Sequence, residues 1–375
     1  MSHGSGRVVE GLIRELRRTG GVHITLVAAG GSEADQRAMR ESVDAFFPAE
    51  RVDVAALGPA ARAVESLRSA WFEYARRTPR FAAKMVRASF ERATASALAT
   101  GPFDVIQAEI GGLASVVDLL PTGTPTILVD HEAGTPNGGA LADEPLTFDW
   151  VRRTYPRWDH VVALTEADAR ILGGVVGRDV SVRPVGVEVP TVSASVEPGS
   201  VLFFGSAEHA PNLDALRRLA TGIWPRVVAA RPDAVLKVAM GAVPDDLGTL
   251  ISRAGIRHLG FVRDIHALVA STAVVVAPLR LGGGIRIKNL ETLAAGRPLV
   301  TTATGASGIG IVDGLHGRLA EDDAGIAAAI VDLLAHPEDA EALGGRGRAL
   351  VARRCSHAAA ADWTLEMWWR VRSDR

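Results

Sequence analysis

The most informative stretch of the chain is residues 273–302, AVVVAPLRLGGGIRIKNLETLAAGRPLVTT. An apolar, β-branched run ends at Pro278, three glycines follow at 282–284, and a helical pattern runs from about Arg286 to Ala295. A strand, a glycine-rich loop and a helix in this order build parallel α/β sheets. Glycines let backbone N–H groups approach a ligand closely, and a helix N-terminus favours an anion. The stretch therefore predicts an anion-binding turn at the end of a parallel strand.

Two cationic residues, Arg286 and Lys288, stand at the start of this predicted helix. A cation at a helix N-terminus is unfavourable by about 0.3–1 kcal/mol, so the pair makes sense if an anion binds there. Lys288 and Glu291 are three residues apart and share a helix face. Lysine occurs only at positions 84, 237 and 288 of this arginine-rich chain, which favours a specific use of the ammonium at 288. The alternative is a solvated Lys–Glu pair beside a structural glycine turn, and these residues alone leave both interpretations open.

The same alternation of strand and helix runs through the whole chain. Apolar runs rich in β-branched residues lie at 23–28, 51–57, 103–109, 125–130, 160–164 and 181–185 in the first half, and at 201–205, 234–240, 273–278 and 298–302 in the second. Short buried runs separated by helical segments are typical of parallel sheets made of βα units. We therefore expect an α/β protein with two Rossmann-like domains.

A segment without periodicity, TVSASVEPGS at residues 191–200, separates the two halves and predicts a linker. We expect an N-terminal domain over 1–188, a linker over 189–200, a C-terminal domain over 201–355, and a final helix over 356–375 that crosses back to the N-terminal domain. A doubly wound domain usually opens with a strand, whereas this chain enters a helix directly from Gly4-Ser5-Gly6. We interpret the opening strand as missing, either because the gene start lies further upstream or because the sheet has one strand fewer.

Composition excludes several classes of protein. The 375 residues, 47% of them hydrophobic, suffice for about two domains of roughly 150 residues each. A net charge of −2 gives no cationic field for nucleic acid. The single cysteine, Cys355, excludes an internal disulfide and a cysteine-rich metal site. No apolar run approaches the roughly 18 residues of a transmembrane helix, and the N-terminus lacks the apolar core of a signal peptide, so we expect a cytoplasmic protein.

Several ordered motifs resemble those of one family. GGGIRIKNLETLAAGRPLVTT (282–302) is similar to the nucleotide-diphosphate signature of retaining GT-B glycosyltransferases, the glycosyltransferase family 4 group. VLFFGSAEHAPNLDAL (201–216) resembles the opening of their C-terminal domain, and TILVDHEA (126–133) resembles their strand that ends in a His–acidic pair. The resemblance implies the GT-B fold, an α/β architecture in which two Rossmann-like domains with parallel sheets face each other across a cleft.

The same resemblance implies roles for individual residues. Arg286 and Lys288 would bind the donor diphosphate, and Glu291 would accept hydrogen bonds from the ribose hydroxyls. The Gly205-Ser206 turn would lie under the phosphates, and the backbone near Phe261 and Val262 would line the base pocket. The candidate catalytic residues are His131, which would face the transferred sugar, together with Arg286 and Lys288. The candidate donor-binding residues are Gly205, Ser206, Phe261, Val262, Gly283, Gly284, Arg286, Lys288 and Glu291.

Two positions depart from the common pattern of the family. Gly283 stands where many members carry a first glutamate, so this chain has a GGG-RxK-xxE variant. The residue after His131 is Glu132 rather than the commoner aspartate. From the residues alone, His131 has a second interpretation, a strand-end histidine satisfied by backbone.

The resemblance implies a reaction as well as a fold. It implies retaining transfer of a sugar from a nucleotide-diphosphate-sugar to a hydroxyl acceptor, which would be a glycan, a lipid-linked compound or a small molecule. It implies no cofactor and no metal, because basic groups stabilise the leaving diphosphate. Two alternatives remain: a sugar-nucleotide epimerase of the same fold, and a degenerate, non-catalytic homologue that binds nucleotide sugars. A dehydrogenase is disfavoured, because the three glycines lack the spacing of a dinucleotide fingerprint.

The segment WFEYARRTPRFAAKMVRASFERA (71–93) mixes basic and apolar residues and has two interpretations. It could lie on an anionic membrane as a peripheral contact that brings the enzyme to a lipid-linked acceptor. Alternatively, it is an amphipathic helix whose apolar stripe packs in the core while its arginines face solvent.

Overall fold

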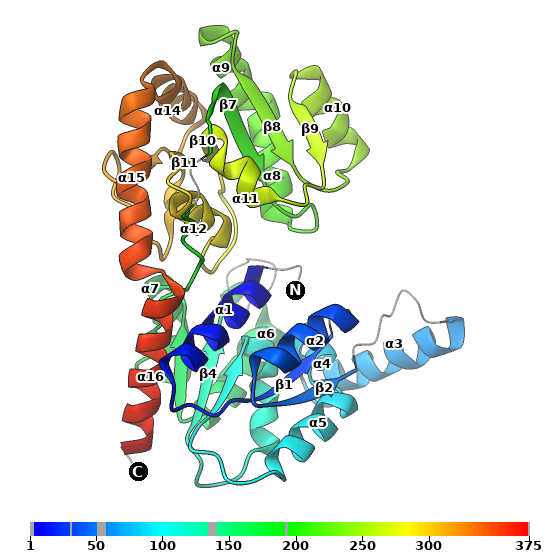
Figure 1. Cartoon of the computed structure of the whole chain (residues 1–375). Coiled ribbons are helices and arrows are strands. Elements are labelled where there is room, and N and C mark those ends of the chain that lie inside the picture. The colour runs from blue at the N-terminus through cyan, green and yellow to red at the C-terminus, as the bar shows by residue number, and fades with distance from the viewer. Residues whose placement is uncertain (1–3, 31, 51–57, 134–140, 192–193, 374–375) are drawn as a thin grey trace. The chain divides into compact units, whose positions relative to one another are not determined.

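The computed structural model describes residues 4–30, 32–50, 58–133, 141–191 and 194–373. The chain divides into two compact units (Figure 1). Unit 1 comprises Met1–Pro184 together with Ala360–Arg375, and unit 2 comprises Val185–Ala359. Each unit has its own parallel strands and its own hydrophobic core, as an α/β protein requires.

The strands of unit 1 form two sets, all of them paired in parallel. The first set is β1 (Thr25–Ala29) with β2 (Ala45–Ala49). The second set pairs in the order β3 (Ile106–Glu109), β4 (Thr126–Asp130), β5 (His160–Ala163) and β6 (Ser181–Val182). In β4 all five residues are buried, which matches the continuous apolar run expected of a strand covered on both faces.

Helices connect the strands of unit 1. They are α1 (Gly4–Thr19), α2 (Glu33–Ser42), α3 (Pro59–Tyr74), α4 (Arg80–Met85), α5 (Ala88–Leu98), the 3-10 helices η1 (Gly111–Leu119), η2 (Leu141–Asp143) and η3 (Tyr155–Arg157), α6 (Pro145–Thr154) and α7 (Glu166–Val176). The last helix of the chain, α16 (His357–Ser373), has most of its length in this unit. Its Ala360 and Ala361 pack against Leu12 and Leu16 of α1.

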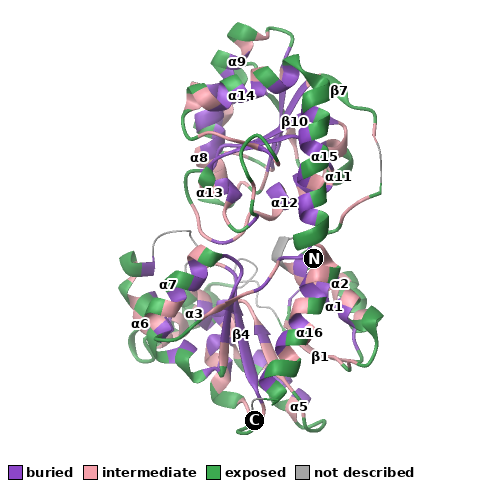
Figure 2. Cartoon of the chain, turned by 90° about the vertical axis from the view of Figure 1, so that its left-hand side faces the viewer, coloured by how far each residue is buried: buried purple, intermediate pink, exposed green. Residues whose placement is uncertain are grey.

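Unit 2 contains one six-stranded parallel sheet in the order β12-β11-β10-β7-β8-β9. The strands are β7 (Glu197–Phe204), β8 (Val235–Ala239), β9 (Arg257–Gly260), β10 (Thr272–Ala277), β11 (Leu299–Thr301) and β12 (Arg318–Leu319). The helices are α8 (Ala210–Arg218), the π-helical turn η4 (Leu219–Ile223), α9 (Trp224–Ala230), α10 (Asp245–Arg253), α11 (Ile265–Ala270), α12 (Ile287–Ala294), α13 (Ala303–Ala306), α14 (Asp323–Ala335) and α15 (Pro337–Arg354). The central strands are buried, and the helices that cover them turn a buried stripe inward and an exposed face outward (Figure 2).

Some sequence-based predictions need correction. The strand predicted at 51–57 lies outside the described residues, and a strand that the sequence did not indicate, β2, precedes it. The segment 71–93 is not one amphipathic helix, since α3 ends at Tyr74 and two shorter helices follow. Arg77 adopts a left-handed conformation with φ 49°, and Val86 is non-helical with ψ 88°, so the chain turns twice within this segment. Among the described helices, none combines the length and the hydropathy that crossing a membrane requires.

Candidate functional site

The glycine loop of unit 2 connects the end of β10 to the start of α12. Gly282 and Gly284 adopt φ values of 103° and 71°, which side-chain-bearing residues rarely tolerate. A Cβ atom at Gly282 would also lie 2.6 Å from Nη2 of Arg286. The Arg286 guanidinium in turn donates to the backbone carbonyls of Gly283 and Leu281. The loop therefore depends on glycine at 282, and Arg286 holds it in this shape.

The N-terminus of α12 lies directly after this loop. Arg286 occupies the N-cap position, no side chain caps the helix, and no acidic residue lies in its first turn. An uncapped helix start carries partial positive charge and backbone donors. Together with the two cationic side chains, this end of α12 is suited to an anion.

Lys288 links the glycine loop to the end of the neighbouring strand. Its Nζ donates to the backbone oxygen of Phe204 at 3.1 Å and to Oδ1 of Asn212 at 2.7 Å. It also lies 4.6 Å from the ring centroid of Phe203. Burial, and to a smaller extent the nearby Arg286, lower the pKa of Lys288 to about 7. Among the described residues, both acceptors that hold the ammonium are neutral.

The turn after β7 is built around Asn212. Gly205 directly follows β7, and a Cβ atom there would lie 2.7 Å from Nδ2 of Asn212. That amide donates to the backbone oxygen of Ser206 at 2.9 Å, while its oxygen accepts from Lys288. Asn212 thus fixes both the turn and the lysine. No role was predicted for Asn212 from the sequence, although its place in the first turn of α8, directly after the strand and its glycine turn, is a usable signal.

A second link joins the glycine loop to α8. Arg280, which precedes the glycines, forms a two-pronged ion pair with Asp214 at 2.6 and 3.1 Å. Because β7 and β10 are adjacent in the sheet, their carboxyl ends meet, and open α/β sheets bind ligands at that edge. The structure therefore brings Gly205, Ser206, Arg286 and Lys288 to one edge of one sheet.

The other residues predicted to bind the nucleotide-sugar donor lie outside the group of contacts around Lys288. Glu291 is half-buried on α12, one turn after Lys288. Phe261 and Val262 follow β9, the edge strand, which β8 separates from β7. The side chain of Phe261 is 84% exposed. These two residues are therefore at the carboxyl edge of the sheet but outside the group around Lys288.

His131 belongs to unit 1, where it directly follows β4 and is buried. Its Nε2 lies 3.0 Å from Oε2 of Glu109, the last residue of β3. Arg183, 1% exposed and placed just after β6, donates to both carboxylate oxygens of Glu109. The histidine is therefore held by a buried ion pair rather than by backbone.

Glu109 remains ionised in this network. Burial by itself would raise the pKa of its carboxyl group, but the Arg183 charge and the hydrogen bond with His131 lower it to about 2. An ionised carboxylate only accepts, so Nε2 of His131 carries the proton in this contact. The nitrogen that would meet a substrate hydroxyl is therefore Nδ1. Glu109 and Arg183 were not predicted as site residues, although each is a charged residue at or directly after the end of a strand.

Two family models match the chain. Glycosyltransferase Family 4 matches residues 2–189, half of the chain, and Glycosyl transferases group 1 matches residues 198–336. The chain therefore belongs to glycosyltransferase family 4, and its two α/β units have the GT-B architecture. No curated protein sequence matches it significantly.

Solved structures with the same fold show low sequence identity to the chain. HepE from Anabaena, solved in complex with UDP and glucose, is 13% identical with a TM-score of 0.66; the alignment covers 98% of this chain and 96% of HepE. Sucrose-phosphate synthase from Thermosynechococcus elongatus is 14% identical with a TM-score of 0.70, over 97% of this chain and 92% of the synthase. TarM is 16% identical with a TM-score of 0.61 over 72% of this chain, which spans only 54% of TarM. At these identities the likeness shows the fold alone.

Proposed function

We propose that the chain is a retaining glycosyltransferase that moves a sugar from a nucleoside diphosphate sugar to a hydroxyl acceptor without a metal ion. The observation that carries the proposal is Lys288, a half-buried ammonium whose acceptors in the described part of the chain are neutral, beside Arg286 and an uncapped helix start. Such an arrangement is costly without an anion and favourable with one. Family membership supports the reading of that anion as the donor's diphosphate.

In this proposal the diphosphate, the ribose and the base of the nucleotide-sugar donor are each bound by different residues. Arg286 and Lys288 bind the diphosphate, with backbone donors of Gly283, Gly284 and the Gly205-Ser206 turn beside them. Glu291 accepts from the ribose hydroxyls, as a carboxylate one helical turn beyond the phosphates would. The backbone of Phe261 and Val262 lines the base.

The proposed chemistry follows from where charge develops. Cleavage of the sugar–phosphate bond puts negative charge on the leaving diphosphate, and preorganised donors at that point contribute on the order of 2.7–4 kcal/mol each. Arg286 and Lys288 supply this stabilisation, so a bound cation is not needed. His131 hydrogen-bonds the transferred sugar through Nδ1, and Glu109 positions it through Nε2. Retention follows if the acceptor attacks from the side on which the diphosphate leaves.

Calorimetry tests the donor site. Lys288→Ala and Glu291→Ala should each weaken binding of UDP, GDP or ADP, whichever binds best, by roughly tenfold or more, the loss typical of a charge-assisted contact. Lys84→Ala is the matched control, because Lys84 is an exposed lysine of unit 1. Unchanged binding in both site variants would refute the assignment.

Product analysis tests the reaction class. NMR of the glycoside should show the anomeric configuration of the donor, and an inverted product would exclude retention. Incubation with donor alone separates transfer from epimerisation, because an epimerase changes the donor without an acceptor. A homologue that only binds nucleotide sugars would give neither product.

We also propose a peripheral membrane contact, which the sequence placed in segment 71–93 and which we now assign to α3 (Pro59–Tyr74), a helix that shares only residues 71–74 with that segment. Later in the segment Val86 and Phe90 are buried, so these two apolar side chains pack in the core. In α3, by contrast, no residue is buried, and Val64, Leu67, Trp71 and Tyr74 are 51–84% exposed at helical spacing on one face. Arg62 is exposed on α3, and Arg76 lies over the ring of Trp71 at 5.3 Å, whereas Arg77 and Arg80 pair with Asp149 and Glu73; basic side chains beside an apolar face suit an anionic lipid surface.

Vesicle sedimentation tests the membrane contact. The protein should bind phosphatidylglycerol vesicles and not phosphatidylcholine vesicles, and replacement of Leu67 and Trp71 by aspartate should abolish the difference. Equal binding to both kinds of vesicle would refute the proposed membrane contact of α3.

A further inference from the structure

A buried tyrosine and a buried aspartate lie beside His131 and have no part in the proposed chemistry. Asp130 is the last residue of β4, directly before His131, and it is 2% exposed. Its Oδ2 atom accepts a hydrogen bond of 2.8 Å from Oη of Tyr155, which is fully buried. A buried carboxyl group is costly unless its hydrogen bonds are made, so Asp130 depends on its partners for its place in the core.

The other oxygen of Asp130 shapes the turn that carries His131. Oδ1 accepts from the backbone N–H of Glu132 at 3.1 Å, so the side chain of residue 130 bridges across residue 131. A contact between a carboxylate and the N–H two residues further on is an Asx-turn. Ala133, which follows, has a φ of 48°, so the chain bends again directly after this turn. Asp130 therefore sets the direction in which His131 leaves the backbone.

The end of β3 is fitted against the same pair of side chains. Ile110 directly follows Glu109 and has a φ of 88°, which a β-branched residue rarely adopts. Gly111 comes next, and a Cβ atom there would overlap Oη of Tyr155 and lie 2.8 Å from Oδ1 of Asp130. Strained backbone persists only where its surroundings hold it, and such strain gathers at functional sites. The bend at Ile110 therefore brings Gly111 against the buried pair, while Glu109, just before it, meets the histidine ring.

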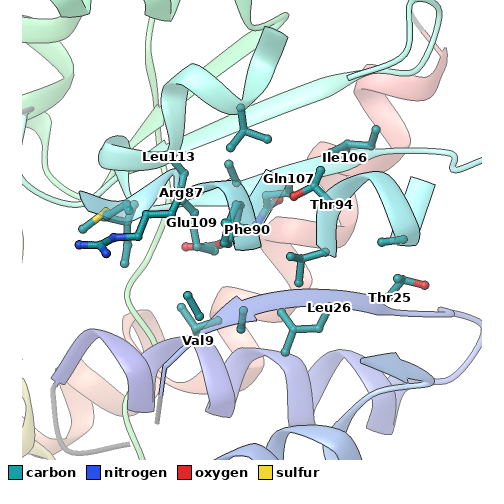
Figure 3. Close-up of a pocket in the computed structure, with 18 of the residues that line it drawn as sticks. Val9, Thr25, Leu26, Arg87, Phe90, Thr94, Ile106, Gln107, Glu109 and Leu113 are labelled. Atoms are coloured by element: carbon teal, nitrogen blue, oxygen red, sulfur yellow. Dashed lines mark hydrogen bonds between the residues drawn. The ribbon is translucent and has the colours of Figure 1, made fainter. Parts of the chain in front are cut away.

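The contacts on the β4 side are the ones that hold the end of β3. Figure 3 shows Gln107 and Glu109 of β3 at the wall of a cavity of unit 1, whose volume is 1330 Å³. Ile110 lines the same cavity, and its backbone N–H donates to the carbonyl oxygen of Val129 in β4 at 2.9 Å. With the cavity on one side, the position of Glu109 depends on β4 and on the turn that follows it.

The hydroxyl of Tyr155 adds to this arrangement what its ring does not. The ring packs edge-to-face on Trp150 with the centroids 5.7 Å apart, a contact that a phenylalanine would also make. Burial, together with the neighbouring Asp130, raises the pKa of Tyr155 well above its usual range, so the hydroxyl keeps its proton and donates it. The contribution of the hydroxyl is therefore its hold on Asp130.

We propose that Tyr155 is a positioning residue for His131 and acts through Asp130. The hydroxyl holds the carboxylate, and the carboxylate holds the turn over residues 130–132. The turn aims the imidazole ring, so that Nε2 meets Glu109 and Nδ1 is presented to the transferred sugar. The contact with the sugar rests on the proposed function, whereas the positioning is a property of the ligand-free chain.

NMR of the ligand-free protein tests the positioning. The ring Nε2–H of His131 gives a proton–nitrogen signal that is assigned by its loss in His131→Ala, and the hydrogen bond with Glu109 protects this proton from exchange with water. In Tyr155→Phe the proton should exchange roughly tenfold faster or more. Ser115→Ala is the matched control, because it removes a hydrogen bond from the neighbouring ring of Trp150 and leaves the aspartate untouched. Unchanged exchange in Tyr155→Phe, or equal acceleration in the control, would overturn the proposal.

A second variant covers the case in which Tyr155→Phe folds poorly. Asp130→Asn keeps the size of the side chain but offers one acceptor oxygen to two donors, so it weakens the same hold from the other side. The exchange of the His131 ring proton should again accelerate. An unchanged signal in folded Asp130→Asn protein would overturn the proposal.

Calorimetry with a sugar nucleotide separates a positioning role from a merely structural one. UDP-glucose, GDP-mannose and ADP-glucose are the probes, each compared with its nucleoside diphosphate, and the pair that the wild-type chain binds best is used. Tyr155→Phe should weaken binding of the sugar nucleotide roughly fivefold, about the loss of one hydrogen bond, and leave the nucleoside diphosphate unaffected. In the His131→Ala background it should have no further effect, because the residue through which it acts is gone.

Two outcomes of this cycle distinguish the positioning from the proposed function. Equal weakening by Tyr155→Phe with and without the histidine would overturn the positioning role. If His131→Ala by itself leaves binding of the sugar nucleotide unchanged, the proposed contact between His131 and the sugar is refuted, while the exchange experiment still decides the role of Tyr155.

Discussion

The lowered pKa of Lys288 predicts that nucleotide binding weakens as pH rises above neutrality. In the ligand-free protein this pKa is about 7, because the ammonium is desolvated and lies near Arg286. A bound diphosphate brings at least two negative charges to Nζ and raises the pKa, so the ligand selects the protonated lysine. Affinity is therefore greatest below pH 7 and falls as pH rises from 7 towards the pKa of the complex.

The size of the effect follows from the titration. With a free pKa of about 7, roughly half of the lysines are protonated at pH 7 and about 3% at pH 8.5, so Kd should rise about sixteenfold, or roughly 1.6 kcal/mol. The second ionisation of a phosphate group has a pKa near 6 and is complete over this range, so the ligand itself contributes little.

Calorimetry in two buffers with different ionisation enthalpies measures the linked proton directly. At pH 8.5 binding should take up nearly one proton, and Lys288→Arg should bind with little pH dependence, because arginine keeps its charge. A Kd that is flat between pH 7 and 8.5, without proton uptake, would show that Lys288 does not meet the diphosphate.

Three further predictions concern neighbouring contacts. Asn212→Ala removes an acceptor from Lys288 and should weaken nucleotide binding roughly tenfold and move its pH dependence to lower pH, as titration calorimetry would show. Glu109→Gln leaves a buried arginine without its counter-charge and should lower the free energy of unfolding in urea by roughly 3–5 kcal/mol, with wild-type stability lost as pH falls from about 4.5 towards 2. Gly282→Ala should cost roughly 1–3 kcal/mol of stability, since alanine would have to adopt a φ of 103°, whereas Gly345→Ala on an open face of α15 should raise Tm slightly.

Local signals in the sequence predicted most elements of the fold. Thr165 and Asp264 are residue types that cap helices, and their side chains accept from the backbone N–H groups of Asp168 and Ala267. Gly296 follows α12 with a φ of 69°, as is common for a glycine after a helix. The start and the end of a helix depend on residues within a few positions of one another, so the sequence alone is enough to predict them.

Contacts between distant parts of the chain could not be predicted in the same way. Glu109 and Arg183 are 74 positions apart, and Lys288 is 84 positions from Phe204, so only the sheet topology brings them together. The sequence offered an anion site as one of two interpretations of Lys288, and it did not indicate the neutral oxygens that accept from the ammonium. The strand β2, AFFPA, was missed because it is short and contains proline, which strands admit only at edges or bulges.

The final helix of the chain is coupled to the histidine of the same unit through a relay of three hydrogen bonds. Nε1 of Trp368 donates to Gln107 at 2.8 Å, Gln107 donates to Glu109 at 2.6 Å, and Glu109 accepts from His131 at 3.0 Å. Trp368 and Gln107 are separated by 261 positions. Removal of the chain from Trp368 onward would therefore break the first hydrogen bond of this relay and loosen the packing of His131, which lies at the other end of it.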